Sequence, residues 1–203
     1  MTPAPDVRRA ADGRSRCGWV TDDAQYRRYH DEEWGDPLHG DRALFEKLSL
    51  EAFQSGLAWI TILRRRDDFR RAFAHFDPST VAAFGDGDVD RLLADATIIR
   101  NRAKIEATIA NARVLQSHLD REPGWLDRLV WQHTPDPRSA PPRSLDEVPA
   151  STPESHALAR SLKEHGWRFI GPTTAYALMQ SAGLVNDHVA GCWRSQAAGR
   201  GSG

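Results

Sequence analysis

The sequence predicts an all-α fold for this chain of 203 residues. The alternation of apolar and polar residues that marks a half-buried strand is weak, because Val, Ile and Thr rarely recur at every second position. Apolar residues instead recur at helical spacing in several segments. The length suits one domain with a substantial core, and the 40% hydrophobic and 27% charged content is typical of a globular protein.

The helices follow from this spacing in chain order. Asp41 begins the first helix. Its apolar face carries Leu44, Phe45, Leu48 and Ala52. Glu51 comes one turn after Leu48 and two turns after Leu44, so it shares this apolar face. Further helices are expected over residues 66–75, 86–94, 98–116 and 154–165.

A tight turn joins the helix over residues 154–165 to a last helix. Gly166 and Gly171 bracket this turn, and Pro172 stands at the first helical position, where its missing N–H costs nothing. The last helix runs to about residue 182 and ends at Gly183. Backbone N–H groups of a hairpin that leads into a helix can hold a phosphate, which makes Gly166, Gly171 and Thr173 the candidate contacts.

The remaining segments are expected to be irregular. Residues 1–15 contain arginines but no apolar run, so they are expected to form a disordered leader and not a secretory signal. Six prolines make residues 134–153 a long loop, and the Gly-rich residues 195–203 are expected to form a disordered tail. One domain is therefore expected over residues 16–194.

The charge balance limits the classes of function. Lys and Arg number 27 and Asp and Glu number 28, so the formal net charge is −1. This argues against binding nucleic acid through overall charge, although basic clusters within residues 64–71, 100–104 and 160–168 leave room for a local basic face. Solvated helix faces are the commoner explanation of any one such cluster. No segment is long enough for a transmembrane helix, and we expect a cytoplasmic protein whose two cysteines stay reduced.

The two cysteines belong to a possible metal site assembled from both halves of the chain. Cys17 and His30 lie near one end, and His188 and Cys192 lie near the other, four residues apart. On a helical turn that spacing places both side chains on one face. Two thiolates and two imidazoles form a closed tetrahedral zinc site, which is structural because no ligand position stays open. The alternative, two buried cysteines and two hydrogen-bonded histidines, is not excluded by the spacing alone.

Aromatic residues concentrate near a carboxylate. Within 41 residues the chain carries Trp19, Tyr26, Tyr29, Trp34 and Trp59. Glu51 lies on an apolar helix face in the same region. Aromatic rings with a carboxylate suit a flat, electron-poor or cationic ligand. An ordinary aromatic core in which Glu51 pairs with an arginine is the more common explanation of such a cluster.

Several motifs in the same order resemble one enzyme family. They are RCGWV at residues 16–20, YHDEEWG at 29–35, LEAFQSGLAWIT at 50–61, FIGPTT at 169–174 and VNDHV at 185–189. Together they resemble the DNA-3-methyladenine glycosylase I family, which belongs to the helix-hairpin-helix DNA glycosylase superfamily. The resemblance extends over residues 16–194. It implies that a zinc site ties the N- and C-terminal segments of such a fold together.

The resemblance also implies roles for individual residues. Cys17, His30, His188 and Cys192 match the zinc ligands. Glu51 matches the residue that contacts the excised base, Trp59 one that stacks on it, and Tyr29 one that hydrogen-bonds within the pocket. The pocket or its wall is matched by Trp19, Tyr26 and Trp34. Gly56 and Leu57 resemble the loop that fills the gap left by the flipped nucleotide. Ala58 and Ala177 depart from the family, because small polar residues are expected at both positions.

The implied function is base-excision repair of alkylated DNA. The resemblance predicts hydrolysis of the N-glycosidic bond of N3-methyladenine after base flipping, which leaves an abasic site. No lysine lies in the motifs, so lyase chemistry is not expected. The expected partners are alkylated double-stranded DNA and free 3-methyladenine as product, with one structural Zn²⁺ per monomeric chain. The alternative is a non-catalytic, zinc-stapled module that binds DNA or senses alkylation damage.

Overall fold

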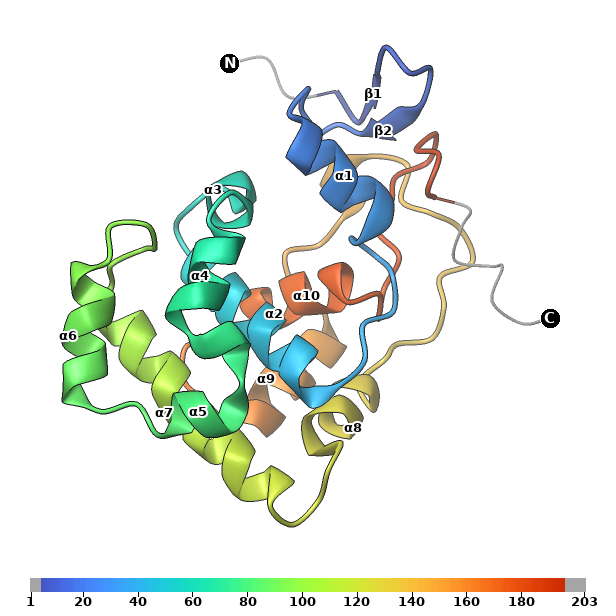
Figure 1. The fold of residues 1–203 in the computed structure, drawn as a ribbon. Coiled ribbons are helices and arrows are strands. Elements are labelled where there is room, and N and C mark those ends of the chain that lie inside the picture. Colours follow the sequence, from blue (N-terminus) through green and yellow to red (C-terminus); the bar gives the residue numbers. More distant parts are fainter. Residues whose placement is uncertain (1–4, 196–203) are drawn as a thin grey trace. The chain divides into compact units, whose positions relative to one another are not determined.

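A computed structural model describes residues 5–195 of the protein, which are mostly helical (Figure 1). The chain divides into two compact units, each assembled from separate segments. Unit 1 comprises the described residues of Met1–Pro37, Thr134–Ala150 and Met179–Gly203, and unit 2 comprises Leu38–His133 and Ser151–Leu178. The sequence suggested one domain over residues 16–194 and gave no sign of this division.

Unit 1 contains the only two strands of the described residues. Its elements are β1 (Val7–Arg9), β2 (Ser15–Cys17), α1 (Ala24–Glu32) and the 3-10 turn η2 (Leu145–Glu147). The strands pair antiparallel with Val7 opposite Cys17. The predicted disordered leader is therefore wrong for residues 7–15. The hairpin is stable because Val7 packs against the buried cluster of Cys17 and Cys192, a tertiary contact that a local pattern cannot reveal.

Two capping features order the rest of unit 1. The Asp23 side chain accepts a hydrogen bond from the N–H of Tyr26 at 2.9 Å and begins α1. Gly183 follows the last helix with φ of +77°, and a Cβ there would lie 2.6 Å from the backbone of Asp36. Only glycine fits this position, so the stop predicted at Gly183 also determines how closely two segments of unit 1 approach each other.

Unit 2 holds most of the helices. Its elements are α2 (Asp41–Gln54), α3 (Trp59–Leu63), α4 (Arg66–Ala72), the 3-10 turn η1 (Ala74–Phe76), α5 (Pro78–Ala82), α6 (Asp86–Ala94), α7 (Arg102–Leu119), α8 (Trp125–Trp131) and α9 (Pro153–Glu164). Helix α10 (Pro172–Ser181) begins in unit 2 and ends in unit 1. The long helix α7 contacts α2, α5, α6 and α8 (Figure 1). Helices α2 and α7 therefore form the scaffold of this unit.

The helices predicted from apolar spacing are present, with shifts at their ends. Helix α2 begins at Asp41 and α6 matches its predicted range. Helix α7 starts at Arg102, four residues later than expected, because the Asn101 side chain accepts from the N–H of Lys104 and caps the helix there. Helix α4 ends at Ala72, before η1, whose residues adopt positive φ. The short helices α1, α3, α5 and α8 were not predicted.

The predicted helix, hairpin and helix are present as α9, residues 165–171 and α10, which begins at Pro172 as expected. Gly166 and Phe169 have positive φ in the turn. The side-chain amide of Asn111, on α7, makes two hydrogen bonds with the backbone of this turn. Its Nδ2 donates to the carbonyl of Arg168 at 3.0 Å, and its Oδ1 accepts from the N–H of Arg168 at 2.8 Å. A side chain of the central helix thus fixes the shape of the hairpin.

Residues 134–150 form an irregular segment apart from η2, as the prolines predicted. Ser195 lies in a turn and bonds the carbonyl of Cys192, while residues 1–4 and 196–203 of the predicted leader and tail lie outside the described residues. Within residues 5–195, no helix is long and apolar enough to cross a membrane.

Candidate metal centre and active site

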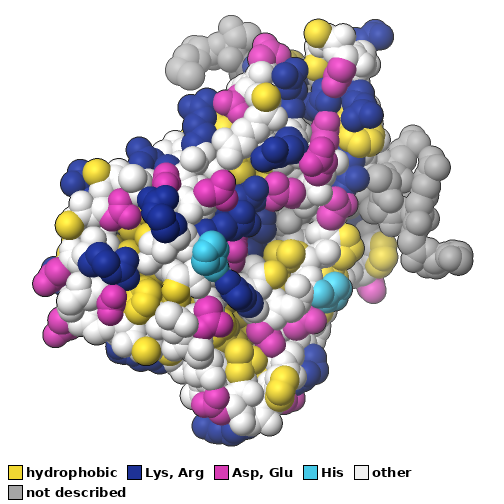
Figure 2. All heavy atoms as spheres, viewed as in Figure 1, with side chains coloured by type: hydrophobic (Ala, Val, Ile, Leu, Met, Phe, Trp, Pro, Cys, Tyr) yellow, Lys and Arg dark blue, Asp and Glu magenta, His cyan; other side chains and the backbone are white. Residues whose placement is uncertain are grey.

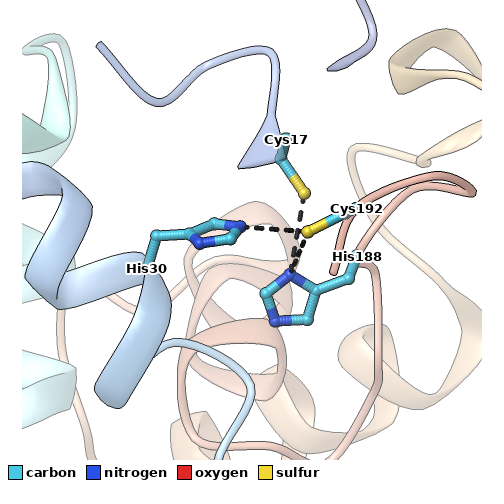
Figure 3. A group of neighbouring side chains, drawn as sticks. All are labelled: Cys17, His30, His188 and Cys192. Atoms are coloured by element: carbon cyan, nitrogen blue, oxygen red, sulfur yellow. Dashed lines mark hydrogen bonds between the residues drawn. The ribbon is translucent and has the colours of Figure 1, made fainter. Parts of the chain in front are cut away.

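The four predicted metal ligands meet in unit 1 (Figure 3). Cys17 ends β2, His30 lies in the last turn of α1, and His188 and Cys192 lie in the chain after α10. Their ligand atoms all lie within 4.8 Å of one another, and all four side chains are buried. Sγ of Cys192 is 3.4 Å from Nε2 of His30, and Nδ1 of His188 is 3.6 Å from each sulfur. This group could bind a metal ion.

The helical turn that the spacing of His188 and Cys192 suggested is wrong. Residues 184–195 form turns and irregular chain. Gly191 has φ of +87°, and the N–H of Cys192 bonds the carbonyl of Val189 at 2.9 Å. A glycine-dependent turn brings the two side chains together instead, because Gly191 adopts a conformation that interrupts a helix.

Hydrogen bonds orient both imidazoles toward the cluster. Nδ1 of His30 lies 2.8 Å from Oδ1 of Asp31, so Nε2 of His30 faces the sulfurs. Nε2 of His188 lies 3.2 Å from the carbonyl oxygen of Trp34, so Nδ1 faces the sulfurs. When the outward nitrogens donate to these oxygens, the inward nitrogens carry the lone pairs that a metal needs. Gly35 permits this approach, because a Cβ there would lie 3.2 Å from Nε2 of His188.

Asp31 is itself held by several donors. Nε of Arg16 donates to Oδ1 at 2.9 Å, Nη2 of Arg16 donates to Oδ2 at 2.6 Å, and the indole N–H of Trp193 donates to Oδ1 at 3.2 Å. Burial alone would raise the pKa of Asp31, but the hydrogen bonds from Arg16, His30 and Trp193 outweigh it and lower that pKa. Asp31 therefore stays ionised and strengthens His30 as an electron donor.

The two thiols influence each other. Hydrogen bonding to Cys192, together with burial, raises the pKa of Cys17. Contacts with the sulfur of Cys17 and with the rings of His188 and His30 outweigh burial and lower the pKa of Cys192. One sulfur is thereby held as the thiolate form that binds metals.

Two predicted base-binding aromatic residues, Trp19 and Trp34, contact the histidines, and Tyr26 packs against Trp19. The ring centroid of Trp19 lies 5.1 Å from that of Tyr26 and 5.1 Å from that of Trp34. Trp34 lies edge-on to His188 at 4.6 Å. These rings form one aromatic cluster with the metal ligands, and burial raises the pKa of Tyr26. Tyr29, on α1, is buried in the same unit.

Glu51 and Trp59 belong to unit 2. Glu51 lies in the last turn of α2 and is 5% exposed, as its place on the apolar face predicted. Trp59 begins α3 and is 9% exposed. Nζ of Lys47 lies over the Trp59 ring, 5.7 Å from its centroid. Lys47 and Glu51 are four residues apart on α2, so the carboxylate and the ammonium lie on the same face of the helix.

The turn between α2 and α3 contains Gly56 and Leu57. Gly56 has φ of +85°, a conformation that favours glycine. Leu57 is 40% exposed, which is unusual for a large apolar side chain in this protein. The hairpin between α9 and α10 likewise exposes Gly166, Gly171 and Thr173. Both predicted DNA-contacting segments are therefore accessible to a ligand.

Three residues of the predicted basic clusters form ion pairs within the chain. The ion pairs are Arg70 with Glu46 and Asp67, Arg71 with Asp68, and Arg102 with Asp90 and Glu106. Figure 2 shows Lys and Arg side chains interspersed with Asp and Glu on one face of the molecule. The uncommitted positive charge is smaller than the sequence suggested.

Asp187 has structural partners. Its side chain is fully buried, Nη1 of Arg138 lies 2.7 Å from Oδ1, and Nε2 of Gln180 donates to Oδ2 at 2.8 Å. These contacts anchor the chain directly before His188. The geometry gives no reason to assign Asp187 a catalytic role.

Comparison with known proteins decides the family. The family model for methyladenine glycosylase matches residues 19–195. The chain is 49% identical over 181 residues to DNA-3-methyladenine glycosylase 1 of Escherichia coli strain K12, an alignment that covers 87% of this chain and 95% of the relative. The chain belongs to the methyladenine glycosylase family.

Solved structures of this family share the fold. A crystal structure of 3-methyladenine DNA glycosylase I matches with a TM-score of 0.83 and 46% identity, covering 88% of this chain and 98% of the other. A variant of 3-methyladenine DNA glycosylase I in complex with 3-methyladenine matches with a TM-score of 0.81 and 30% identity, covering 89% of this chain and 97% of the other. The mostly helical architecture is therefore that of the methyladenine glycosylases.

Two polar residues that shape these sites were not among the predicted site residues. Asp31 orients His30, and its position directly after a predicted ligand was the available signal. Lys104 is buried at the start of α7, and a single lysine inside a basic cluster gave no signal. Asp31 is oriented by Arg16, fifteen residues earlier, and Lys104 bonds a carbonyl of α2. Both contacts form only when the chain is folded.

Proposed function

We propose that the protein excises N3-methyladenine from alkylated double-stranded DNA as a monofunctional DNA glycosylase. The likeness to 3-methyladenine DNA glycosylases over nearly the whole chain carries this proposal. The buried carboxylate of Glu51 and the ring of Trp59 at adjacent helix ends are the local features that support it.

The reaction breaks one bond and forms one. The nucleotide must leave the stack before an enzyme can reach its glycosidic bond. Methylation at N3 makes adenine cationic, so the electrons of the C1′–N9 bond pass to the base, which departs as neutral 3-methyladenine. Water adds to C1′ and loses a proton to solvent, which leaves an abasic site. Because the base is already a good leaving group, little acid catalysis is required of the protein.

The pocket residues select the cationic base. A carboxylate in a buried setting attracts a positive charge strongly, which assigns Glu51 to recognition of the base. Trp59, also in unit 2, offers a ring face for stacking. For Tyr29, Trp19, Tyr26 and Trp34, which belong to unit 1, the proposed roles in base binding rest on the family resemblance. Glu51 acts by binding more than as a general base.

The metal of unit 1 is zinc, bound by Cys17, His30, His188 and Cys192. In a tetrahedral zinc site the sulfur and nitrogen ligand atoms are separated by about 3.5 Å. The observed sulfur–nitrogen distances of 3.4 and 3.6 Å agree with that value. Four protein ligands leave no position for water, so the ion stabilises unit 1 and takes no part in hydrolysis. Reduced, metal-binding thiols suit the cytoplasm.

DNA contacts are assigned to the two exposed segments of unit 2 and the start of α10. Gly56 and Leu57 occupy the gap left by the flipped nucleotide, and the backbone of Gly166, Gly171 and Thr173 holds a phosphate. Because ion pairs within the chain occupy Arg70, Arg71 and Arg102, undamaged DNA is bound weakly. The binding that remains is electrostatic and therefore depends strongly on salt. The protein acts as a monomer.

The test is release of the free base. The purified protein is incubated with methylated duplex DNA, and 3-methyladenine in the supernatant is quantified by chromatography. Release under single-turnover conditions supports the enzyme. Binding of methylated DNA without release would contradict it and favour a damage-sensing module. Metal analysis of the same preparation tests the zinc assignment, which fails at less than about half an equivalent per chain.

A further inference from the structure

Lys104 is a buried lysine whose ammonium group donates hydrogen bonds to the end of another helix. It lies in the first turn of α7 and is 8% exposed. Its Nζ donates to the carbonyl of Phe53 at 2.9 Å and to the carbonyl of Ser55 at 2.8 Å. Both oxygens belong to the C-terminal end of α2. Burial lowers the pKa of Lys104, which is a cost that these two hydrogen bonds offset.

Three successive carbonyls at the end of α2 each accept a hydrogen bond from outside the helix. The last carbonyls of a helix have no partner within it. The carbonyl of Gln54 accepts the N–H of Leu57 at 2.6 Å, and Lys104 takes the carbonyls on either side of it. The side chain of Lys104 and the backbone of Leu57 therefore determine together how the chain leaves α2.

At this end of α2 the chain turns between residues of the proposed active site. Glu51 lies in the last turn before it, Trp59 begins the next helix, and the exposed Leu57 lies between them. The C-terminal end of a helix carries partial negative charge, which repels DNA phosphate. An ammonium group bonded to these carbonyls offsets that charge directly beneath the turn.

We propose that Lys104 is a positioning residue for lesion recognition, which fixes the α2–α3 turn and neutralises the end of α2 so that Leu57 can occupy the gap left by a flipped nucleotide. This inference rests on the proposed glycosylase function. Lys104 touches neither base nor reacting atoms in this scheme. It acts through the backbone of residues 53–57.

The test compares Lys104→Met with Arg113→Met. Arg113 lies on the same helix and makes the same kind of contact, because its Nε donates to the carbonyl of Ala82 at 3.0 Å and its Nη2 to the carbonyl of Phe84 at 2.7 Å. These carbonyls lie at the end of α5 and two residues beyond it, and α5 carries no proposed site residue. The control thus loses an equivalent cap in a part of unit 2 without a binding role.

Three quantities are measured on folded, metal-loaded proteins: affinity for duplex DNA with an abasic-site analogue, affinity for the undamaged duplex, and the single-turnover rate of 3-methyladenine release. Lys104→Met is expected to weaken binding of the abasic duplex about tenfold and to slow release about tenfold, with a smaller loss of affinity for the undamaged duplex, in which Leu57 fills no gap. Arg113→Met is expected to match wild type in all three. A merely structural lysine would not change the ratio of the two affinities.

The outcomes separate this inference from the proposed function. Wild-type protein that releases no base overturns both. Wild-type release with an unchanged Lys104→Met variant overturns only the role of Lys104. Lys104→Gln, which keeps N–H donors without the charge, is expected to show a smaller loss of discrimination, and it serves if Lys104→Met does not fold. Failure of both variants to fold, with Arg113→Met folded, also overturns the inference, because Lys104 is then required by the fold itself.

Discussion

The two units of this protein build their functional groups in different ways. In unit 1 each metal-binding histidine has one polar partner that sets its orientation, and Asp31 is held in turn by Arg16. In unit 2 Glu51 and Trp59 owe their places to where α2 ends and α3 begins. Unit 1 therefore depends on a hydrogen-bond network around a candidate metal site, and unit 2 depends on helix packing and helix ends. Substitutions should affect the two units through different observables.

The sharpest test of this contrast removes a metal ligand. Cys192→Ala is expected to abolish metal binding and to lower the free energy of unfolding by several kcal/mol, since structural zinc contributes about 10–16 kcal/mol of apparent binding energy in small zinc domains. Metal analysis and thermal unfolding followed by circular dichroism measure both effects. His156→Ala removes an exposed imidazole and serves as control. Full metal content in Cys192→Ala would remove the basis of the comparison.

A milder change tests the network behind the ligands. Asp31→Asn keeps the shape of the side chain but loses its charge, so metal affinity is expected to fall about 10–100-fold. Competition with a chromophoric chelator measures this affinity. Asp12→Asn is the control, because Asp12 bonds Arg16 but not His30. Equal affinities for the two variants would mean that Asp31 does not tune the site.

In unit 2 the expected effect is on reaction rate, with metal content unchanged. Glu51→Gln is expected to lower single-turnover release of 3-methyladenine at least tenfold, about 1.4 kcal/mol in barrier height, because the charge that attracts the cationic base is lost. Glu46→Gln, on the same helix but paired with Arg70, should keep the wild-type rate. An unchanged rate in folded Glu51→Gln would refute the assignment.

The smallest effect concerns a helix end that carries no proposed site residue. Asp77 caps α5 by accepting from the N–H of Thr80 at 2.9 Å, and hydrogen bonds from Thr80 and Ser79 lower its pKa to about 2. Because this pKa is depressed in the folded state, the stabilisation is complete above the unfolded value near 4 and is lost as the pH falls through about 2.

Asp77→Ala should therefore cost about 1 kcal/mol in unfolding free energy at pH 7. Urea unfolding at several pH values measures the difference from wild type, which should shrink with acidification below about pH 4. A difference that is independent of pH would show that the ionised carboxylate is not the cap. Release of base and metal content should not change.

The sequence predicted helices with a regular apolar spacing and sites whose residues form a recognisable motif. The apolar spacing located α2, α6, α7 and α9, and Pro172 marked the start of α10. The four metal ligands were predicted as a set, and Glu51 was correctly placed on a buried helix face.

The sequence failed where a structure depends on contacts distant along the chain. Each strand of the β1–β2 hairpin is three residues long, and packing of Val7 on the cysteines stabilises the hairpin. No local sequence pattern therefore marks it. Lys104 looked like part of a solvated basic cluster, yet it is buried against carbonyls about fifty positions earlier. The four-residue spacing of His188 and Cys192 fits a helical turn and the turn at Gly191 equally well, so spacing alone does not distinguish the two geometries.

Unit 1 is assembled from the first and the last segments of the described chain, so it can be completed only late in synthesis. Unit 2 is complete once Leu178 has been made, and a domain can fold while the ribosome is still adding residues. The metal cluster cannot close until Cys192 has followed, although Cys17 and His30 are among the earliest residues translated. The cluster can therefore assemble only after nearly all of the described chain has been synthesised. A metal ion could be held by all four side chains only from that point on.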